Sequence, residues 1–158
     1  MVYVYHHALV SVLKRLCGKL IQNPQINIDW AGVILERVTG MKLNDYMQEH
    51  IFKPLGIQHV NMFPTKEMID NLAYMHQRDA IGILHERDHL YRRALRAKTQ
   101  EEKDRIFNSA GAGLFARPNE YIKVLAVLLN DGKSPTTGAQ ILKPETVKMM
   151  FENQIPDQ

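Results

Sequence analysis

Segment 118–132, "PNEYIKVLAVLLNDG", constrains the fold more than any other part of this chain, because it is the most apolar stretch with helical spacing. Pro118 stands in the first turn, where the missing backbone N–H does no harm, and Gly132 follows the last apolar residue. The apolar stripe consists of Tyr121, Ile122, Val124, Leu125, Val127, Leu128 and Leu129. We expect this helix to form the core of the fold. No apolar run reaches about 18 residues, so we expect no membrane span.

The rest of the chain is divided by proline and glycine into short segments. The predicted helices span 7–21, 30–39 with Asp29 as N-cap, 43–52, 65–72 with Thr65 as N-cap, 99–106 with a Thr99–Glu102 capping box, and 143–154. Segments 72–79 and 80–84 are candidate strands, and "NSAGAG" (108–113) is a predicted turn in which the backbone can approach a neighbour closely. The predicted fold class is therefore α+β, and mostly helical.

Composition excludes several classes of protein. The 158 residues suffice for one ordinary domain, and a net charge of +3 is too small to argue for nucleic-acid binding. A cluster of basic residues contains Arg87, Arg92, Arg93, Arg96 and Lys98. Acidic residues follow it directly, so we interpret this segment as a solvated surface. The single cysteine, Cys17, excludes an internal disulfide. The N-terminal stretch has no leading basic region, so we expect a cytoplasmic protein.

Residues 85–89 match H-E-x-x-H, in which two histidines on one helical face bind Zn²⁺ and the glutamate acts as general base. Two features of the surrounding residues oppose a zinc site here. Arg87 and Arg92 place positive charge beside the metal, and Leu95 occupies the position of the third histidine in the longer form of the motif. The remaining histidines of the central part, His50, His59 and His76, stand singly and are expected to be surface or capped residues. We predict no metal and no cofactor.

Three separate blocks resemble one known family, in the order that the family has them. They are "IDWAGVILERVTGMKLNDYMQEHIFKPLG", "SAGAGLFARPNEYIKVLAVLLNDG" and "ILKPETVKMMFENQ". Together they are similar to the serine β-lactamase-related proteins, and "ERDHLYRRALRAKTQEEKDRIF" is similar to the fungal branch, which holds esterases and acyltransferases. The resemblance implies a β-lactamase/transpeptidase-like fold, in which a helical subdomain packs beside an antiparallel sheet domain. It covers residues 25–158, whereas residues 1–24 are predicted to form an N-terminal helix and are not similar to the family.

The resemblance also implies what catalysis needs: a Ser-x-x-Lys nucleophile, a proton-shuttling tyrosine and a late K-T-G-like strand beside the oxyanion hole. The position of the tyrosine is Pro24 here, and the late strand would lie beyond Gln158. Ser11 and Lys14 match the first pattern as a string, but too few residues separate them from the tyrosine position. We therefore assign no catalytic residue and expect a partial domain.

The leading hypothesis is a fragment of a serine hydrolase or acyltransferase that we expect to be inactive, because it lacks the nucleophile, the shuttle tyrosine and the late strand. Complete relatives would act on a small acyl ester, thioester or amide. The alternative is a non-catalytic helical module that binds a protein or ligand through an exposed half-groove. A zinc hydrolase is the third and least favoured interpretation.

Overall fold

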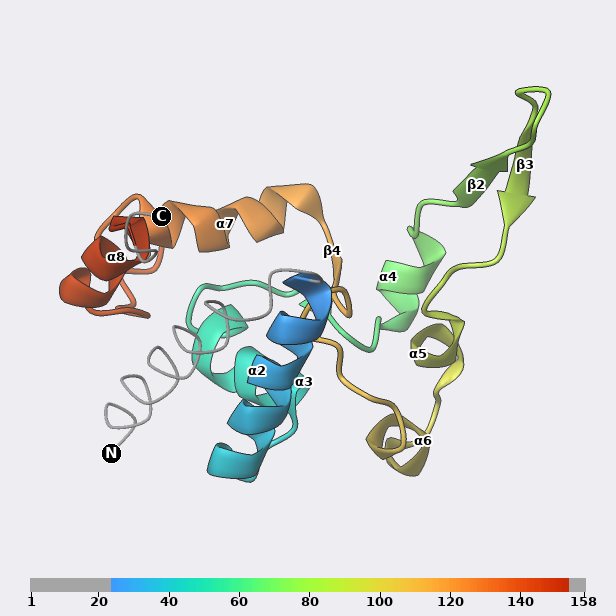
Figure 1. Ribbon diagram of the computed structural model, residues 1–158. Coiled ribbons are helices and arrows are strands. Elements are labelled where there is room, and N and C mark those ends of the chain that lie inside the picture. Colours follow the sequence, from blue (N-terminus) through green and yellow to red (C-terminus); the bar gives the residue numbers. More distant parts are fainter. Residues whose placement is uncertain (1–23, 154–158) are drawn as a thin grey trace.

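The computed structural model describes residues 24–153, and what the sequence predicts for Ser11, Lys14, Cys17 and the helix 7–21 lies outside this range. Figure 1 shows the helices of the chain with a two-stranded hairpin projecting from one side, and a second antiparallel pair of two-residue strands lies within the molecule. In chain order the elements are α2 (Pro24–Thr39), α3 (Leu43–Met47), the π-helix η1 (Gln48–Phe52), β1 (Val60–Asn61), α4 (Lys66–Asp70), β2 (Met75–Arg78), β3 (Leu84–Arg87), α5 (Arg92–Arg96), α6 (Gln100–Asp104), β4 (Phe115–Ala116), α7 (Pro118–Leu128) and α8 (Pro144–Phe151).

Helix α2 is longer than the sequence predicted. It begins at Pro24, a residue suited to a first helical turn, so Asp29 lies inside the helix and is not its N-cap. The predicted stop is confirmed: Gly40 has a φ of 71°, which ends the helix in a left-handed residue. Thr39 accepts a hydrogen bond from the backbone N–H of Met41 and thereby supports the turn into α3.

Three other helices predicted within residues 24–153 are confirmed with small changes at their ends, as is most of segment 143–154. Segment 43–52 is helical throughout, as α3 followed by the π turn of η1. Thr65 caps α4 by accepting from the N–H of Met68, and the Thr99–Glu102 capping box opens α6. Segment 143–154 contains α8.

The hydrophobic core lies between η1, the two-residue strand β1 and α7. It contains Phe52, Leu55, Ile57, Val60 and Val127, and a second cluster joins Met68, Ala94 and Phe115. Strands β1 and β4 pair antiparallel, which brings residues 60–61 beside residues 115–116. These contacts position the segment before α7 against the chain that precedes α4.

Helix α7 is less buried than the sequence predicted. It ends at Leu128, and of its stripe only Val127 is fully buried. The apolar residues cover more of the helix circumference than the core can reach, and so part of the stripe remains exposed. The exposed fractions are 45% for Tyr121, 60% for Ile122, 47% for Leu125 and 85% for Leu129.

The predicted strand at 80–84 is wrong. Strand β2 lies within the predicted segment 72–79, but its partner β3 begins only at Leu84. Residues 79–83 form the turn between them, because Gly82 takes a φ of 92° and Asp79 accepts from the backbone N–H groups of Ile81 and Ile83. Within the described residues no helix is long and apolar enough to cross a bilayer.

Candidate functional site

One face of α2 carries Asp29, Gly32 and Glu36, which are spaced so that they lie in a row along the helix. The carboxylate of Asp29 accepts from the Ser109 hydroxyl at 2.9 Å and from the backbone N–H of Gly111 at 3.1 Å. We call the contact between this face and segment 108–113 the α2 seam. It joins the beginning of the described chain to the segment just before β4.

The other carboxylate of the α2 seam holds two different segments. Glu36 Oε1 accepts from the backbone N–H of Leu43 at 2.8 Å and from the side-chain amide of Asn108 at 3.1 Å. Glu36 thereby fixes the start of α3 and one end of segment 108–113 against the same helix turn.

One glycine allows the α2 seam to close, and a second allows the tight turn within segment 108–113. A Cβ atom on Gly32 would stand 3.0 Å from the side chains of Ala110 and Leu43. A Cβ atom on Gly113 would stand 2.5 Å from the carbonyl oxygen of Ser109, which is closer than real contacts permit. The predicted close approach at "NSAGAG" is therefore confirmed, and its partner is α2.

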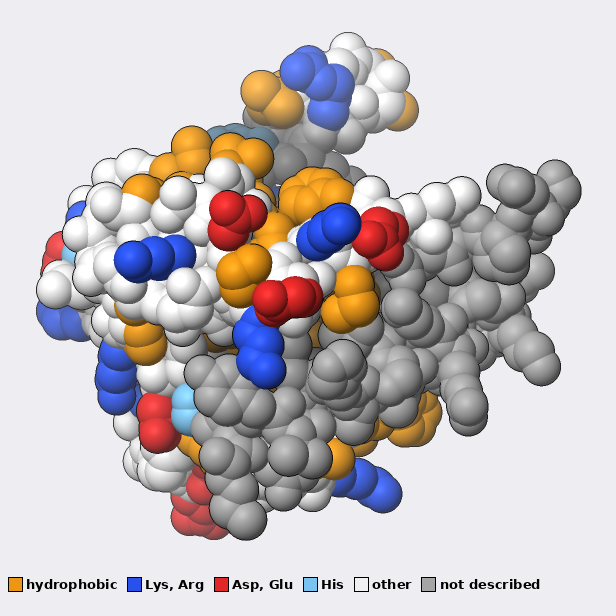
Figure 2. All heavy atoms as spheres, turned by 90° about the vertical axis from the view of Figure 1, so that its left-hand side faces the viewer, with side chains coloured by type: hydrophobic (Ala, Val, Ile, Leu, Met, Phe, Trp, Pro, Cys, Tyr) orange, Lys and Arg blue, Asp and Glu red, His pale blue; other side chains and the backbone are white. Residues whose placement is uncertain are grey.

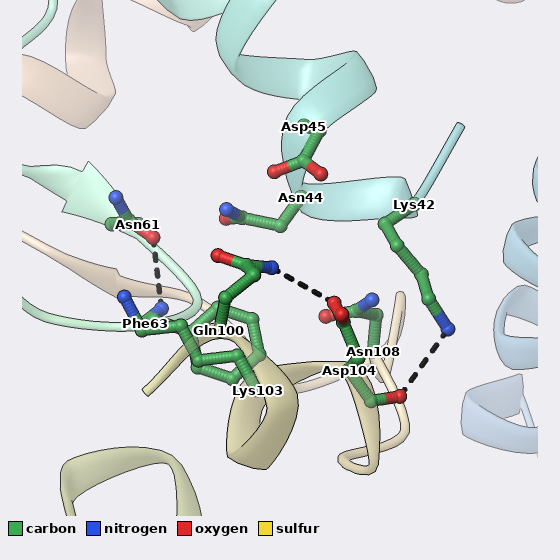
Figure 3. Close-up of a pocket in the computed structure, with 9 residues that line it drawn as sticks. All are labelled: Lys42, Asn44, Asp45, Asn61, Phe63, Gln100, Lys103, Asp104 and Asn108. Atoms are coloured by element: carbon green, nitrogen blue, oxygen red, sulfur yellow. Dashed lines mark hydrogen bonds between the residues drawn. The ribbon is translucent and has the colours of Figure 1, made fainter. Parts of the chain in front are cut away.

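Beside the α2 seam lies a polar hollow of about 90 Å³ (Figure 3). Its walls carry side-chain amides and charges from α3, α6 and the adjoining loops, including Lys42, Asn44, Asp45, Gln100, Asp104 and Asn108. Gln100 donates to Asp104 at 2.8 Å, and the ammonium group of Lys42 lies 3.5 Å from the backbone oxygen of Asp104. Asn108 is 6% exposed, and its amide oxygen is buried with no hydrogen-bond partner among the described residues. These groups suit polar contacts, and the residues that line the hollow include no serine, threonine or cysteine.

The described serines are both engaged in local hydrogen bonds. Ser109 donates to Asp29 and accepts from the backbone N–H of Ala112, while the hydroxyl of Ser134 contacts Thr136 and accepts from the N–H of Thr137. Neither serine has a lysine three residues later. Their hydroxyls hold turns in place, and among the described hydrogen bonds none joins either hydroxyl to a lysine or a histidine.

The H-E-x-x-H residues do not lie on a helix. His85 belongs to strand β3 and its Nε2 lies 2.8 Å from Asp79, whereas His89 follows the strand and its ring lies 5.0 Å from that of Phe115. The helical face required for a two-histidine zinc site is therefore absent from this segment. Among residues 24–153, no three histidine, cysteine or acidic side chains are placed to share a metal ion.

A charged cluster around His59 was not predicted from the sequence. This side chain is only 15% exposed, with its Nδ1 at 3.0 Å from Glu120 and its Nε2 at 3.2 Å from Glu67. Arg117 also contacts Glu67, at 3.0 Å. The partners stand 8 and 61 residues from His59, so no local pattern could have revealed them.

Comparison with known proteins decides the family. The family model described as Beta-lactamase matches residues 25–154, which include the α2 seam and every described element from α3 to α8. The chain belongs to the beta-lactamase family. The resemblance in the sequence is thus confirmed, and the fold is a partial β-lactamase-like α+β fold.

Several similar proteins come from fungi. Monacolin J acid methylbutanoyltransferase of Aspergillus terreus is 38% identical over 131 residues, which are 80% of this chain and 28% of that protein. Lovastatin esterase of Penicillium rubens is 32% identical over 134 residues, covering 81% of this chain and 29% of the relative. An unliganded simvastatin synthase from Aspergillus terreus superposes with a TM-score of 0.62 at 35% identity, covering 80% of this chain and 28% of that structure. This family member therefore spans less than a third of the length of these relatives.

Proposed function

We propose that this chain forms the helical part of an enzyme that transfers or hydrolyses acyl groups through a serine ester. Membership of the beta-lactamase family carries the proposal. Two relatives support it by name, one as a methylbutanoyltransferase and one as an esterase. The substrate class is a small acyl ester, thioester or amide, because each offers a carbonyl that a serine can attack.

We further propose that the 158 residues are inactive by themselves. The position of the family's shuttle tyrosine corresponds to Pro24, whose side chain can neither accept nor donate a proton. The described serines lack the lysine three residues later that the family's nucleophile needs, and their hydroxyls bond to Asp29 and to local backbone and threonine groups. The α2 seam would then position a catalytic groove without supplying its reacting groups.

An esterase assay tests this proposal. The purified chain is mixed with 4-nitrophenyl acetate and 4-nitrophenyl butyrate, and release of nitrophenolate is followed against buffer and against the Ser11→Ala variant. We expect equal rates in all three samples. Turnover that disappears in Ser11→Ala would refute inactivity and identify Ser11 as the nucleophile.

A second candidate function is that of a non-catalytic module that docks onto another protein. The exposed part of the α7 stripe favours it, since a helix with large exposed apolar side chains tends to be covered in its working state. Figure 2 shows hydrophobic side chains reaching the surface between charged ones on the face turned to the viewer. A monodisperse, cooperatively melting monomer in size-exclusion chromatography supports a stable module. Soluble aggregate without a melting transition argues against it.

Two predictions from the sequence remain proposals. A domain division at residues 24 and 25 is supported by the start of the family match at residue 25. A cytoplasmic location is supported by the single cysteine, which excludes an internal disulfide. Limited proteolysis followed by mass spectrometry tests the division, and fractionation of cells that make the tagged chain tests the location.

A further inference from the structure

The His59 cluster joins three segments that are distant in the sequence. His59 immediately precedes β1, Glu67 lies in the first turn of α4, and Glu120 lies in the first turn of α7. Each ring nitrogen of His59 faces a different carboxylate, with Nδ1 at 3.0 Å from Glu120 and Nε2 at 3.2 Å from Glu67. The imidazole is therefore a bridge between α4 and α7.

Both carboxylates already act as acceptors toward other groups. Glu120 Oε2 accepts from the backbone N–H of Gln58 at 2.9 Å and from that of His59 at 2.6 Å. Glu67 Oε1 accepts from the guanidinium of Arg117 at 3.0 Å. A carboxylate that accepts these hydrogen bonds needs a donor, not a lone pair, on the imidazole nitrogen that faces it.

The protonation state of His59 decides how many of these contacts form. The imidazolium has two N–H donors and can satisfy both carboxylates, whereas neutral imidazole has one donor and one lone pair. We propose that His59 is a proton-operated clasp that fixes α4 to the start of α7 when it is charged and loosens α4 when it loses its proton.

The two contacts are unequal, so the clasp opens on one side. Glu120 is held by two backbone N–H groups in addition to Nδ1, and this contact keeps the remaining proton. Nε2 then presents its lone pair to Glu67, which only Arg117 continues to hold. The packing of Met68 in its buried cluster also persists, so α4 loosens without leaving the fold.

The electrostatic surroundings give the direction of the pH dependence. The pKa of His59 is raised above the usual 6.5, mainly by the hydrogen bond to Glu120. Burial and the charge of Arg117 lower this pKa, and the hydrogen bond to Glu67 raises it further. A raised pKa in the folded state means that the clasp is complete below the ordinary pKa. It is lost as pH rises through the folded pKa.

Hydrogen exchange of the complete chain tests this proposal. Protection factors, which remove the intrinsic effect of pH on exchange, are compared at pH 6 and pH 9 for the hydrogen-bonded amides of Ile69 and Leu72. We expect protection in α4 to fall about two- to fivefold at pH 9, the range of a partly exposed ion pair. Protection in α2 should stay constant.

Variants separate the clasp from a general effect of pH. In His59→Gln the pH dependence in α4 should disappear, while His85→Gln, which alters another histidine paired with a carboxylate, should keep it. Glu67→Gln provides a second variant if His59→Gln does not fold, since a side-chain amide can face either a donor or a lone pair and should remove the dependence. Unchanged α4 protection in the wild type, or a persistent pH effect in both clasp variants, would overturn the proposal.

Discussion

At the scale of single residues, Asp29 was predicted to cap a helix, and the structure shows that it makes a tertiary contact instead. Its position before an apolar run suggested an N-cap, yet α2 begins five residues earlier and the carboxylate points to segment 108–113. A carboxylate is useful there because Ser109 and Gly111 both present donors. The same acceptor chemistry serves a cap and a tertiary contact, so the residue type alone cannot distinguish them.

Replacing Asp29 should destabilise the chain through the α2 seam. Asp29→Ala leaves the Ser109 hydroxyl and the Gly111 N–H without their acceptor, and we expect a loss of about 1–3 kcal/mol in the free energy of unfolding. Urea denaturation followed by circular dichroism measures it. Asp70→Ala, which removes only an exposed contact with Lys66, serves as the control and should cost less than about 0.5 kcal/mol. Equal losses in the two variants would contradict this role of Asp29.

At the scale of elements, the β2–β3 hairpin depends on its turn more than on its strands. A two-stranded hairpin is marginal by itself, and seven of its eight strand residues are exposed. Asp79 supplies most of the turn contacts, since Oδ1 accepts from the N–H groups of Ile81 and Ile83 and Oδ2 pairs with His85. The hairpin projects from the molecule in Figure 1, so few other contacts can replace these.

The order of this hairpin should therefore fall in acid. The hydrogen bond from His85, followed by that from Ile83, lowers the pKa of Asp79 below its usual 3.8. A depressed folded pKa gives stability that is present above the ordinary value and lost as pH falls through the folded pKa. Cross-strand nuclear Overhauser effects between Gln77 and His85 should weaken between pH 5 and pH 2.

Variants of two aspartates test whether Asp79 holds the hairpin in place. Asp79→Ala should weaken these cross-strand signals already at pH 5, and Asp88→Ala should not, because Asp88 contacts only Arg92 and Arg96 among the ion pairs of the described chain. Retention of the hairpin in Asp79→Ala would show that its strands suffice.

At the scale of the whole molecule, the main feature is an incompletely covered helix. The core reaches Val124 and Val127 of α7 but leaves the opposite side of the stripe exposed. The chain spans less than a third of its relatives, and the apolar face is where further protein could pack.

Adding a charge to this face should reduce self-association. Ile122→Lys replaces a side chain that is 60% exposed, and we expect sedimentation velocity to show less oligomer than for the wild type at equal concentration. Asn119→Lys adds the same charge one turn earlier without removing apolar surface, and should have a smaller effect. An equal fraction of oligomer in the two variants would show that net charge, and not the loss of apolar surface, reduces self-association.

The sequence by itself determined the local structure and the family. Proline, glycine and capping residues define helix ends through short-range geometry, and Thr65, Gly40 and the Thr99–Glu102 pair act as predicted. Three blocks in the right order sufficed to place the chain in the beta-lactamase family. The tertiary structure alone decided the partners of Asp29, Glu36 and His59, because those contacts join residues up to 82 positions apart. It also decided which side of α7 is buried. An apolar stripe predicts that a helix packs against other residues, but the packing of the neighbouring elements determines how much of the stripe is buried.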